Sequence, residues 1–291
     1  MSNKKNLSRI GLLLAAFIWG VSFVLMKNVL ENVPPFYIVA IRFCGAALIL
    51  LPACARNLKS LDKSYFLGGA LMGVALLLGY AFQTHGLLET TPGKNAFLTS
   101  VYCVITPFLF WAYNKKRPDR FNVVAAFICL VGIGLISVDG DLRIGNGDAL
   151  TIVCGFFYAL HIVITAKFID GRSPIALSML QFAFAGVFAL IAAIIFEPPP
   201  SLGSPDVIWT IVFLTVVSTA LCLLLQVFGL KYTPASQAAV IMTLESVFGA
   251  AASLIVFHEI FTIRLIIGFA LTFIAVIISE TKLEFLRKTR Q

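Results

Sequence analysis

Charged residues are scarce in this sequence: only 12% of its 291 residues are Asp, Glu, Lys or Arg, whereas 59% are hydrophobic. A water-soluble domain of this length could not bury so much apolar surface in one core. The phosphate-binding loop of nucleotide hydrolases is absent, as are the HExxH motif of zinc peptidases and the GxSxG motif of serine hydrolases. We therefore expect a membrane protein that has no cofactor and is not an enzyme.

Histidine and cysteine are also rare, with three and six residues. So few histidines leave little for a metal site. All six cysteines lie inside apolar segments, where neither an extracytoplasmic disulfide nor a zinc site is expected: Cys44, Cys54, Cys103, Cys129, Cys154 and Cys222. We interpret them as small packing residues.

Ten apolar segments are each long enough to cross a bilayer as a helix of roughly 20 residues. They lie at 10–30, 35–54, 64–86, 93–113, 121–138, 148–169, 174–196, 206–230, 234–257 and 262–281. The connections between them are short, which leaves no room for a soluble domain. The first segment is too long for a signal peptide and has no cleavage site after it, so we expect it to be retained.

Basic residues alternate between the two sides of these segments. Seventeen of the 22 fall on one side, and the other side holds only Lys94, Arg143 and Arg264. Since cytoplasmic loops retain Lys and Arg, both termini are predicted to be cytoplasmic. The net charge of +8 is spread over separate short loops, so it is a topology signal and predicts no nucleic-acid partner. Short loops without targeting segments fit a bacterial inner membrane.

The two halves of the chain resemble each other. Matching residues recur at offsets of 139 and 142: Pro35 with Pro174, Trp19 with Tyr158, Arg42 with Gln181, and Thr91-Pro92 with Thr233-Pro234. Each half holds five spans, and an odd number makes the second half enter from the opposite face. We therefore predict one all-α membrane domain of ten helices, built as an inverted repeat of residues 1–141 and 142–291.

Several short motifs follow one another in a characteristic order. They are FIWGVSF at 17–23, AIRF at 40–43, Thr91-Pro92, Gly147-Asp148, and the stretch from Pro234 to Glu259 that contains Glu245. In these motifs and in its length the chain resembles the drug/metabolite transporter superfamily, in particular its ten-helix EamA-type members. The resemblance implies a metabolite carrier, commonly an exporter of amino acids. It also implies a central cavity lined by helices one to four and six to nine, with helices five and ten peripheral. The chain departs from the family at Ser246, where a proline usually follows the ninth-helix Glu.

Three ionisable residues are placed at membrane depth, where an uncompensated charge is costly. Arg42 could bind a substrate carboxylate through its planar fork, or form a structural ion pair with Glu245 or bonds to helix-end carbonyls. Glu245 could couple transport to protons or be that structural partner. His161 could relay protons or bind substrate, or be a packing residue. Lys27 lies nearer a helix end, where pairing with Glu31 is expected.

Polar residues at helical spacing must face inward in lipid, where they line a cavity or helix contacts. One such stripe is Thr215, Thr219, Cys222 and Gln226. Amide and tyrosine side chains are the stronger candidates because lipid cannot satisfy them. The predicted translocation path comprises Trp19, Arg42, Tyr80, Gln83, Asn95, Tyr102, Tyr158, His161, Gln181, Gln226 and Glu245. Pro107 predicts a kink in the fourth span.

The function predicted is that of a secondary transporter that exports small metabolites such as amino acids by alternating access. Its partners would be a small-molecule substrate, the bilayer and protons, with uniport as the alternative to proton coupling. Multidrug or cation efflux and nucleotide-sugar exchange stay open, although phosphate substrates usually require several cavity Lys or Arg residues. An intramembrane enzyme is the remote alternative, since no membrane-embedded carboxylate pair is found. The oligomeric state is left open.

Overall fold

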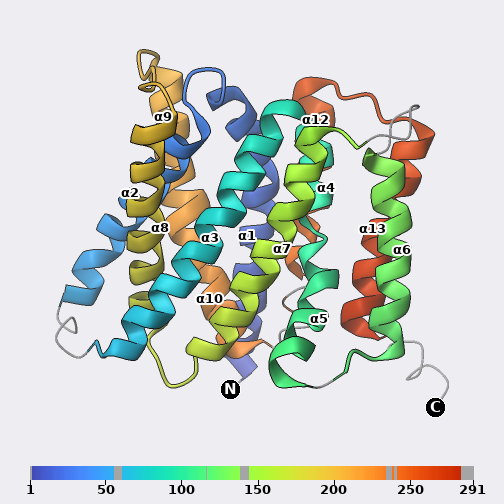
Figure 1. Cartoon of the computed structure of the whole chain (residues 1–291), viewed down its shortest axis with the longest axis horizontal. Helices are drawn as coiled ribbons and strands as arrows, with labels where there is room; N and C mark the ends of the chain where they lie inside the picture. Colours follow the sequence, from blue (N-terminus) through green and yellow to red (C-terminus); the bar gives the residue numbers. More distant parts are fainter. Residues whose placement is uncertain are drawn as a thin grey trace.

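The computed structural model describes residues 2–55, 61–115, 117–137, 144–233, 238 and 241–282. Over these residues the chain forms a helical bundle without a β-strand, and most helices run from one end of the molecule to the other (Figure 1). Eight helical runs are long and apolar enough to cross a membrane, and two shorter apolar helices occur at Leu244–Phe257 and Ile263–Ser279. The all-helical class is confirmed, while the count of ten spans stays a prediction.

The described residues of the first half of the chain form six helices. They are α1 (Ser2–Val29), α2 (Pro35–Ala55), α3 (Lys63–Glu89), α4 (Pro92–Thr99), α5 (Tyr102–Asn114) and α6 (Arg120–Ser137). The second half contains α7 (Asn146–Phe168), α8 (Pro174–Phe196), α9 (Pro205–Phe213), the π-helical segment η2 (Leu214–Leu221), α10 (Cys222–Tyr232), α12 (Leu244–Phe257) and α13 (Ile263–Thr281). The predicted repeat boundary at 141/142 and the predicted helix start at Pro234 lie outside the described residues.

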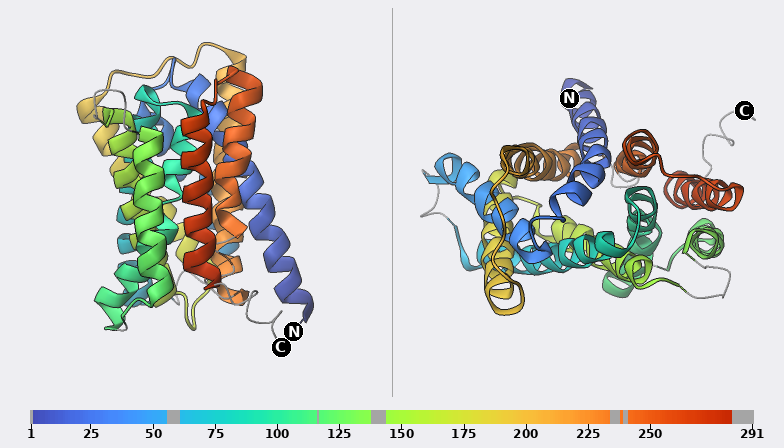
Figure 2. Two further views of the ribbon diagram at one scale, coloured as in Figure 1. Left: turned by 90° about the vertical axis from the view of Figure 1, so that its right-hand side faces the viewer. Right: turned by 90° about the horizontal axis from the view of Figure 1, so that it is seen from above.

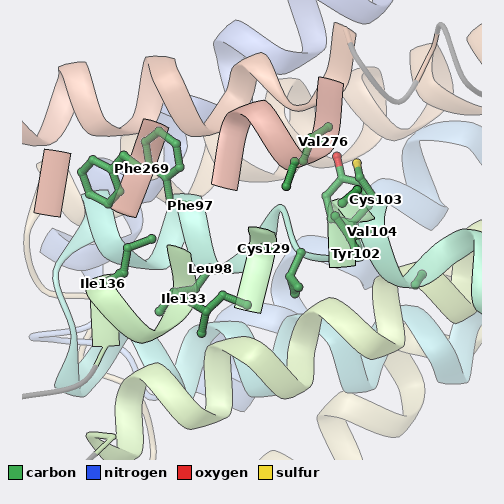
Figure 3. Packing of buried hydrophobic residues seen from close by; sticks show 14 of the residues in the cluster. Phe97, Leu98, Tyr102, Cys103, Val104, Cys129, Ile133, Ile136, Phe269 and Val276 are labelled. Carbon is green, nitrogen blue, oxygen red and sulfur yellow. The ribbon is translucent and has the colours of Figure 1, made fainter. Parts of the chain in front are cut away.

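Helices α6 and α13 form a pair at the edge of the bundle, clearest when the molecule is seen from above (Figure 2). They cross closely because Gly132 and Gly268 lie at the contact: a Cβ on Gly132 would approach Thr272 Oγ1 to 2.5 Å. An apolar cluster joins the pair to α4 and α5, with the rings of Phe97 and Phe269 stacked at 4.0 Å (Figure 3). The fifth and tenth predicted spans, residues 121–138 and 262–281, correspond to α6 and α13. Both lie at the periphery of the bundle, as the family resemblance implied.

The fourth span is two helices rather than one kinked helix. α4 ends at Thr99 and α5 begins at Tyr102, with tight backbone bonds from Val101 N to Leu98 O and from Cys103 N to Ser100 O. The break lies one to two turns before Pro107, which stands inside α5. The kink at Pro107 stays a prediction. A second break precedes α12, at Thr243, whose carbonyl accepts hydrogen bonds from Ser246 N and Oγ. Tyr102 and Leu244, where the helices resume, are 142 residues apart.

The start of α1 and the end of α13 lie at the same end of the bundle (Figure 1). At this end Asp119 joins α6 to α13. Its Oδ1 accepts from the backbone N–H groups of Phe121 and Asn122, and its Oδ2 lies 2.6 Å from Lys282 Nζ. Partial burial of the carboxyl acts to raise its pKa, but the hydrogen bond from Lys282 and the backbone bonds outweigh burial and hold the pKa below its usual value.

Replacing Asp119 with alanine is expected to lower the stability of the bundle by about 1 kcal/mol, because the α6 cap is lost. An Asp with a depressed pKa stabilises the fold above its unfolded-state pKa of about 3.9, and this contribution is lost as pH falls through the lower folded-state value. Thermal unfolding in detergent at pH 7 and in acid measures both effects. Asp119→Asn, which can still cap, should keep most of the stability but lose the pH dependence.

Candidate translocation site

A cavity lies among the middle parts of the helices, between α1, α2, α3, α7, η2 and α10 and the first turns of α5 and α12. The space that no protein atom occupies in it and at its mouth is about 610 Å³. Nine residues of the predicted path line it: Trp19, Arg42, Tyr80, Gln83, Tyr102, Tyr158, His161, Gln226 and Glu245. Asn95 and Gln181 do not line it, nor does any residue of α8, although the seventh helix was expected to contribute.

Arg42 is 1% exposed and is held by neutral groups. Its Nε donates to Thr219 Oγ1 at 2.8 Å and its Nη2 donates to Ser218 Oγ at 3.3 Å. The guanidinium carbon lies 4.8 Å from the centre of the Tyr80 ring, a cation–π contact. The ion pairs of the described residues do not include Arg42 with Glu245, so the alternative of a structural pair between them is wrong.

The hydroxyl groups around Arg42 come from the π-helical segment η2. A π-helix bonds each residue to the fifth one along, which widens the turn, and Thr219 Oγ1 accordingly donates to Leu214 O at 2.7 Å. The segment is fixed from α1, since Trp19 Nε1 donates to Ser218 O and Ser22 Oγ donates to Ser218 Oγ. The predicted stripe assumed α-helical spacing. It therefore missed Ser218, which the wider turn brings to Arg42 beside Thr219.

Glu245 lies in the first turn of α12 and is 6% exposed. No described residue donates a hydrogen bond to its carboxylate or pairs with it. The start of α12 is held close to α1 at Gly20, where a Cβ would lie 2.5 Å from Phe248 Cβ and 2.8 Å from Glu245 O. The partial positive charge at a helix N-terminus favours a carboxylate here, but it does not replace a direct partner.

Gln83 and Tyr158 are polar wall residues that belong to a hydrogen-bonded layer on the α3 and α7 side. Tyr158 OH donates to Gln83 Oε1 at 2.9 Å, and Gln83 Nε2 donates to Thr99 Oγ1 at 3.1 Å. Asn95 stands behind this layer: its Nδ2 donates to Thr151 Oγ1 and to Gln83 O. Asn95 thus ties α4 to α3 and α7 instead of facing the cavity.

Aromatic rings form a further part of the cavity wall. The rings of Tyr80 and Tyr158 meet edge to face at 5.5 Å, and Tyr102 meets Tyr158 in the same way at 6.5 Å. Together the wall offers one guanidinium, one carboxylate, one imidazole, two amides and several rings. This set can bind a small molecule that carries both signs of charge, and it contains no arrangement for nucleophilic catalysis among the described residues.

Comparison with known families identifies the bundle. The model of the EamA-like transporter family matches the chain twice, over residues 7–138 and 145–281. The chain belongs to the EamA-like transporter family. It is therefore an integral membrane protein of a transporter family, as the sequence motifs indicated.

Relatives of this EamA-like transporter carry transporter names without a stated substrate. An "uncharacterized transporter" of Archaeoglobus fulgidus is 33% identical over 94% of this chain and 86% of its own length. The "uncharacterized transporter YoaV" of Bacillus subtilis is 24% identical over 89% of this chain and 91% of its own. A crystal structure of 14% identity has the same fold, with a TM-score of 0.71 over 97% of this chain and 99% of that one.

At the end of the EamA-like bundle opposite the start of α1, polar groups tie the helix ends together. Glu259 accepts from Thr91 Oγ1, Ser253 Oγ and Gly93 N, which caps α4 from the end of α12. Lys94 pairs with Asp148 on α7 at 3.3 Å. These contacts close α4 against α12 and α7 at this end.

Lys27 interacts electrostatically with Glu31, as predicted, but its hydrogen bonds give it a second role. Its ammonium group donates to the carbonyls of Leu87, Leu88 and Thr90 at 2.5, 3.0 and 3.1 Å. These are unpaired carbonyls at the C-terminus of α3, where a cation is favourable. Lys27 is therefore a helix cap. It does not line the cavity, and Arg42 is the one Lys or Arg among the described residues that does.

Proposed function

We propose that this protein is a secondary transporter that exports small zwitterionic metabolites, such as amino acids, in exchange for protons. The proposal rests on one observation: the cavity holds two opposite charges, and neither has a counter-ion among the described residues. Arg42 is held only by neutral partners, and Glu245 has no donor or cation beside it among the described residues. Buried charges are stable only when they are compensated. A substrate with one carboxylate and one ammonium group would compensate both.

The competing substrate classes fit the cavity less well. A lipophilic cation would neutralise Glu245 but would bring a positive charge into a cavity that already holds Arg42. A nucleotide sugar or phosphorylated compound carries two or more negative charges, and Arg42 is the one Lys or Arg among the described residues that line the cavity. An amino acid presents the carboxylate that the planar guanidinium fork recognises.

Alternating access between two inverted repeats is the mechanism that we propose. The family model matches each half of the chain once, and the helix breaks before Tyr102 and Leu244 share the 142-residue offset of the Thr-Pro motifs. Discontinuous helices near the site are a recurrent feature of secondary transporters. We propose that these breaks act as hinges, and that the end of the bundle with the start of α1 is cytoplasmic, in a bacterial inner membrane.

Proton coupling would act through Glu245. A proton and a substrate ammonium group cannot both neutralise the same carboxylate, so their competition exchanges one for the other across the membrane. With an inward proton gradient this exchange drives the substrate outward. No pump domain is needed for such a cycle.

A counterflow assay in proteoliposomes tests the substrate class. The panel consists of leucine, its amine without the carboxylate, and its acid without the amino group, each as a competitor of radiolabelled leucine. We expect leucine to compete at concentrations about 100-fold lower than either single-charge analogue, because each analogue leaves one cavity charge uncompensated.

Protein-free liposomes and liposomes with Glu259→Gln protein, whose substitution lies outside the cavity, serve as controls. Equal competition by the amine would identify a cation carrier and contradict the proposal. The same holds if leucine and a wider set of amino acids fail to exchange in liposomes that contain folded protein.

A further inference from the structure

Gln181 stands behind the cavity wall and contacts one residue of it. It lies on α8, is fully buried, and places its Oε1 at 2.8 Å from Nε2 of His161. Thr165 Oγ1 approaches the same ring nitrogen at 3.5 Å. His161 itself lines the cavity together with Arg42 and Glu245. The contact thus links a cavity residue to a side chain that does not line the cavity.

The backbone of Gln181 is fixed by α3. A Cβ on Gly69 would lie 2.5 Å from Leu180 Cβ, and a Cβ on Gly73 would lie 2.8 Å from Gln181 O. Two small residues four positions apart let membrane helices approach closely. The reach of Gln181 toward α7 therefore follows from the packing of α8 on α3. Such packing suits a residue that must hold another one in a single orientation.

We infer that Gln181 is a positioning residue that keeps a proton on His161 Nε2 and a lone pair on Nδ1, which accepts an N–H of the substrate ammonium group. An amide oxygen carries only lone pairs, so a ring nitrogen 2.8 Å from it must carry the hydrogen. A neutral imidazole has a single N–H, which leaves Nδ1 as an acceptor. No described residue donates to Nδ1.

This role rests on the proposed zwitterionic substrate and adds a selectivity that charge alone does not give. Glu245 attracts any cation, whereas a lone pair requires a hydrogen to bind. An N,N,N-trimethyl amino acid keeps both charges but has no N–H group. We expect the parent protein to bind it about tenfold more weakly than the unmodified amino acid, in line with the loss of one hydrogen bond to a charged group.

Transport kinetics test the link between the two residues. Gln181→Leu and His161→Phe are each expected to raise the KM for leucine about tenfold with little change in kcat, and to abolish the discrimination against the trimethyl analogue. The double variant should also show about a tenfold rise, because both changes remove one interaction. Ser178→Ala is the matched control: Ser178 is a buried polar residue one turn away on α8, and its hydroxyl has no hydrogen-bond partner among the described residues. It should transport like the parent.

A spectroscopic measurement tests the hydrogen bond between His161 and Gln181 independently of transport. In a background with His85→Gln and His258→Asn, His161 is the one histidine left of the three in the sequence. Proton–nitrogen NMR of labelled histidine should show an Nε2–H signal protected from exchange, which disappears in Gln181→Leu. A hydrogen on Nδ1 in the parent, or a protected signal that survives Gln181→Leu, would overturn the assignment. So would a double variant whose KM rises about 100-fold. Absence of amino-acid flux in the parent would refute the proposed function instead, and the NMR result would still stand.

Discussion

Replacing Arg42 with glutamine is expected to raise the KM for a zwitterionic substrate on the order of 100-fold, since a buried charge-assisted pair with the substrate carboxylate is lost. The thermal midpoint should stay the same or rise. Arg42 is 1% exposed and its partners are Thr219, Ser218, Met26 and the Tyr80 ring, none of which is charged. No described residue is a counter-ion of Arg42, and removing such an unpaired buried charge relieves a desolvation cost. Substrate binding, and not stability, is what this arginine provides.

Two further substitutions test the shape of the Arg42 side chain and the tyrosine hydroxyl beside it. Arg42→Lys keeps a cation but loses the fork that spans Thr219 and Ser218, so an intermediate rise in KM is expected. Tyr80→Phe keeps the ring beneath the guanidinium and should have a small effect. Counterflow with leucine measures KM, and thermal unfolding in detergent measures stability. Arg42→Gln protein that unfolds at a much lower temperature would show that the arginine is structural.

Much of the helical frame could be predicted from the sequence, because the apolar segments show the lengths of membrane helices and first-turn prolines show where they begin. Apolar length alone predicted the eight long helical runs. Pro35 and Pro174 begin α2 and α8 as expected, since a first-turn proline loses no hydrogen bond. The start of α4 also follows this rule: Pro92 is its first residue, and the Thr91 side chain caps the helix by accepting a hydrogen bond from Lys94 N. The inward-facing polar residues could also be selected, because lipid excludes any other place for them. This is why most of the predicted path lines one cavity.

Features that depend on local backbone departures could not be predicted. The fourth span breaks at Ser100 and Val101, where no proline or glycine stands, while Pro107 is accommodated inside α5. Eight residues of η2 adopt π-helical geometry, which changes the spacing on which the polar stripe was based and brings Ser218 to Arg42. The direction in which a side chain points could not be predicted either. Gln181 and Asn95 are amides, as expected of cavity residues, but helix packing directs them toward His161 and Thr151.

Replacing Glu245 with glutamine is expected to raise the KM for leucine on the order of 100-fold at neutral pH and to remove the effect of a pH gradient on efflux. In the parent, lowering the pH should raise the KM, because protons compete with the substrate ammonium group for the same carboxylate. The glutamine amide is neutral at every pH, so KM in the variant should be high and independent of pH. Efflux from preloaded proteoliposomes at several pH values, with and without an imposed gradient, measures both.

Glu259→Gln provides the matched comparison because the two glutamates differ in how their carboxylates are satisfied. Glu259 accepts hydrogen bonds from Thr91, Ser253 and Gly93 at the end of the bundle, so its substitution should cost stability and leave the pH response of KM intact. No residue in the described part of the chain donates to Glu245, so its substitution should leave stability unchanged and abolish the pH response. If Glu245→Gln protein keeps a gradient-driven efflux, protons do not compete at this carboxylate, and uniport or another coupling residue must replace the proposed exchange.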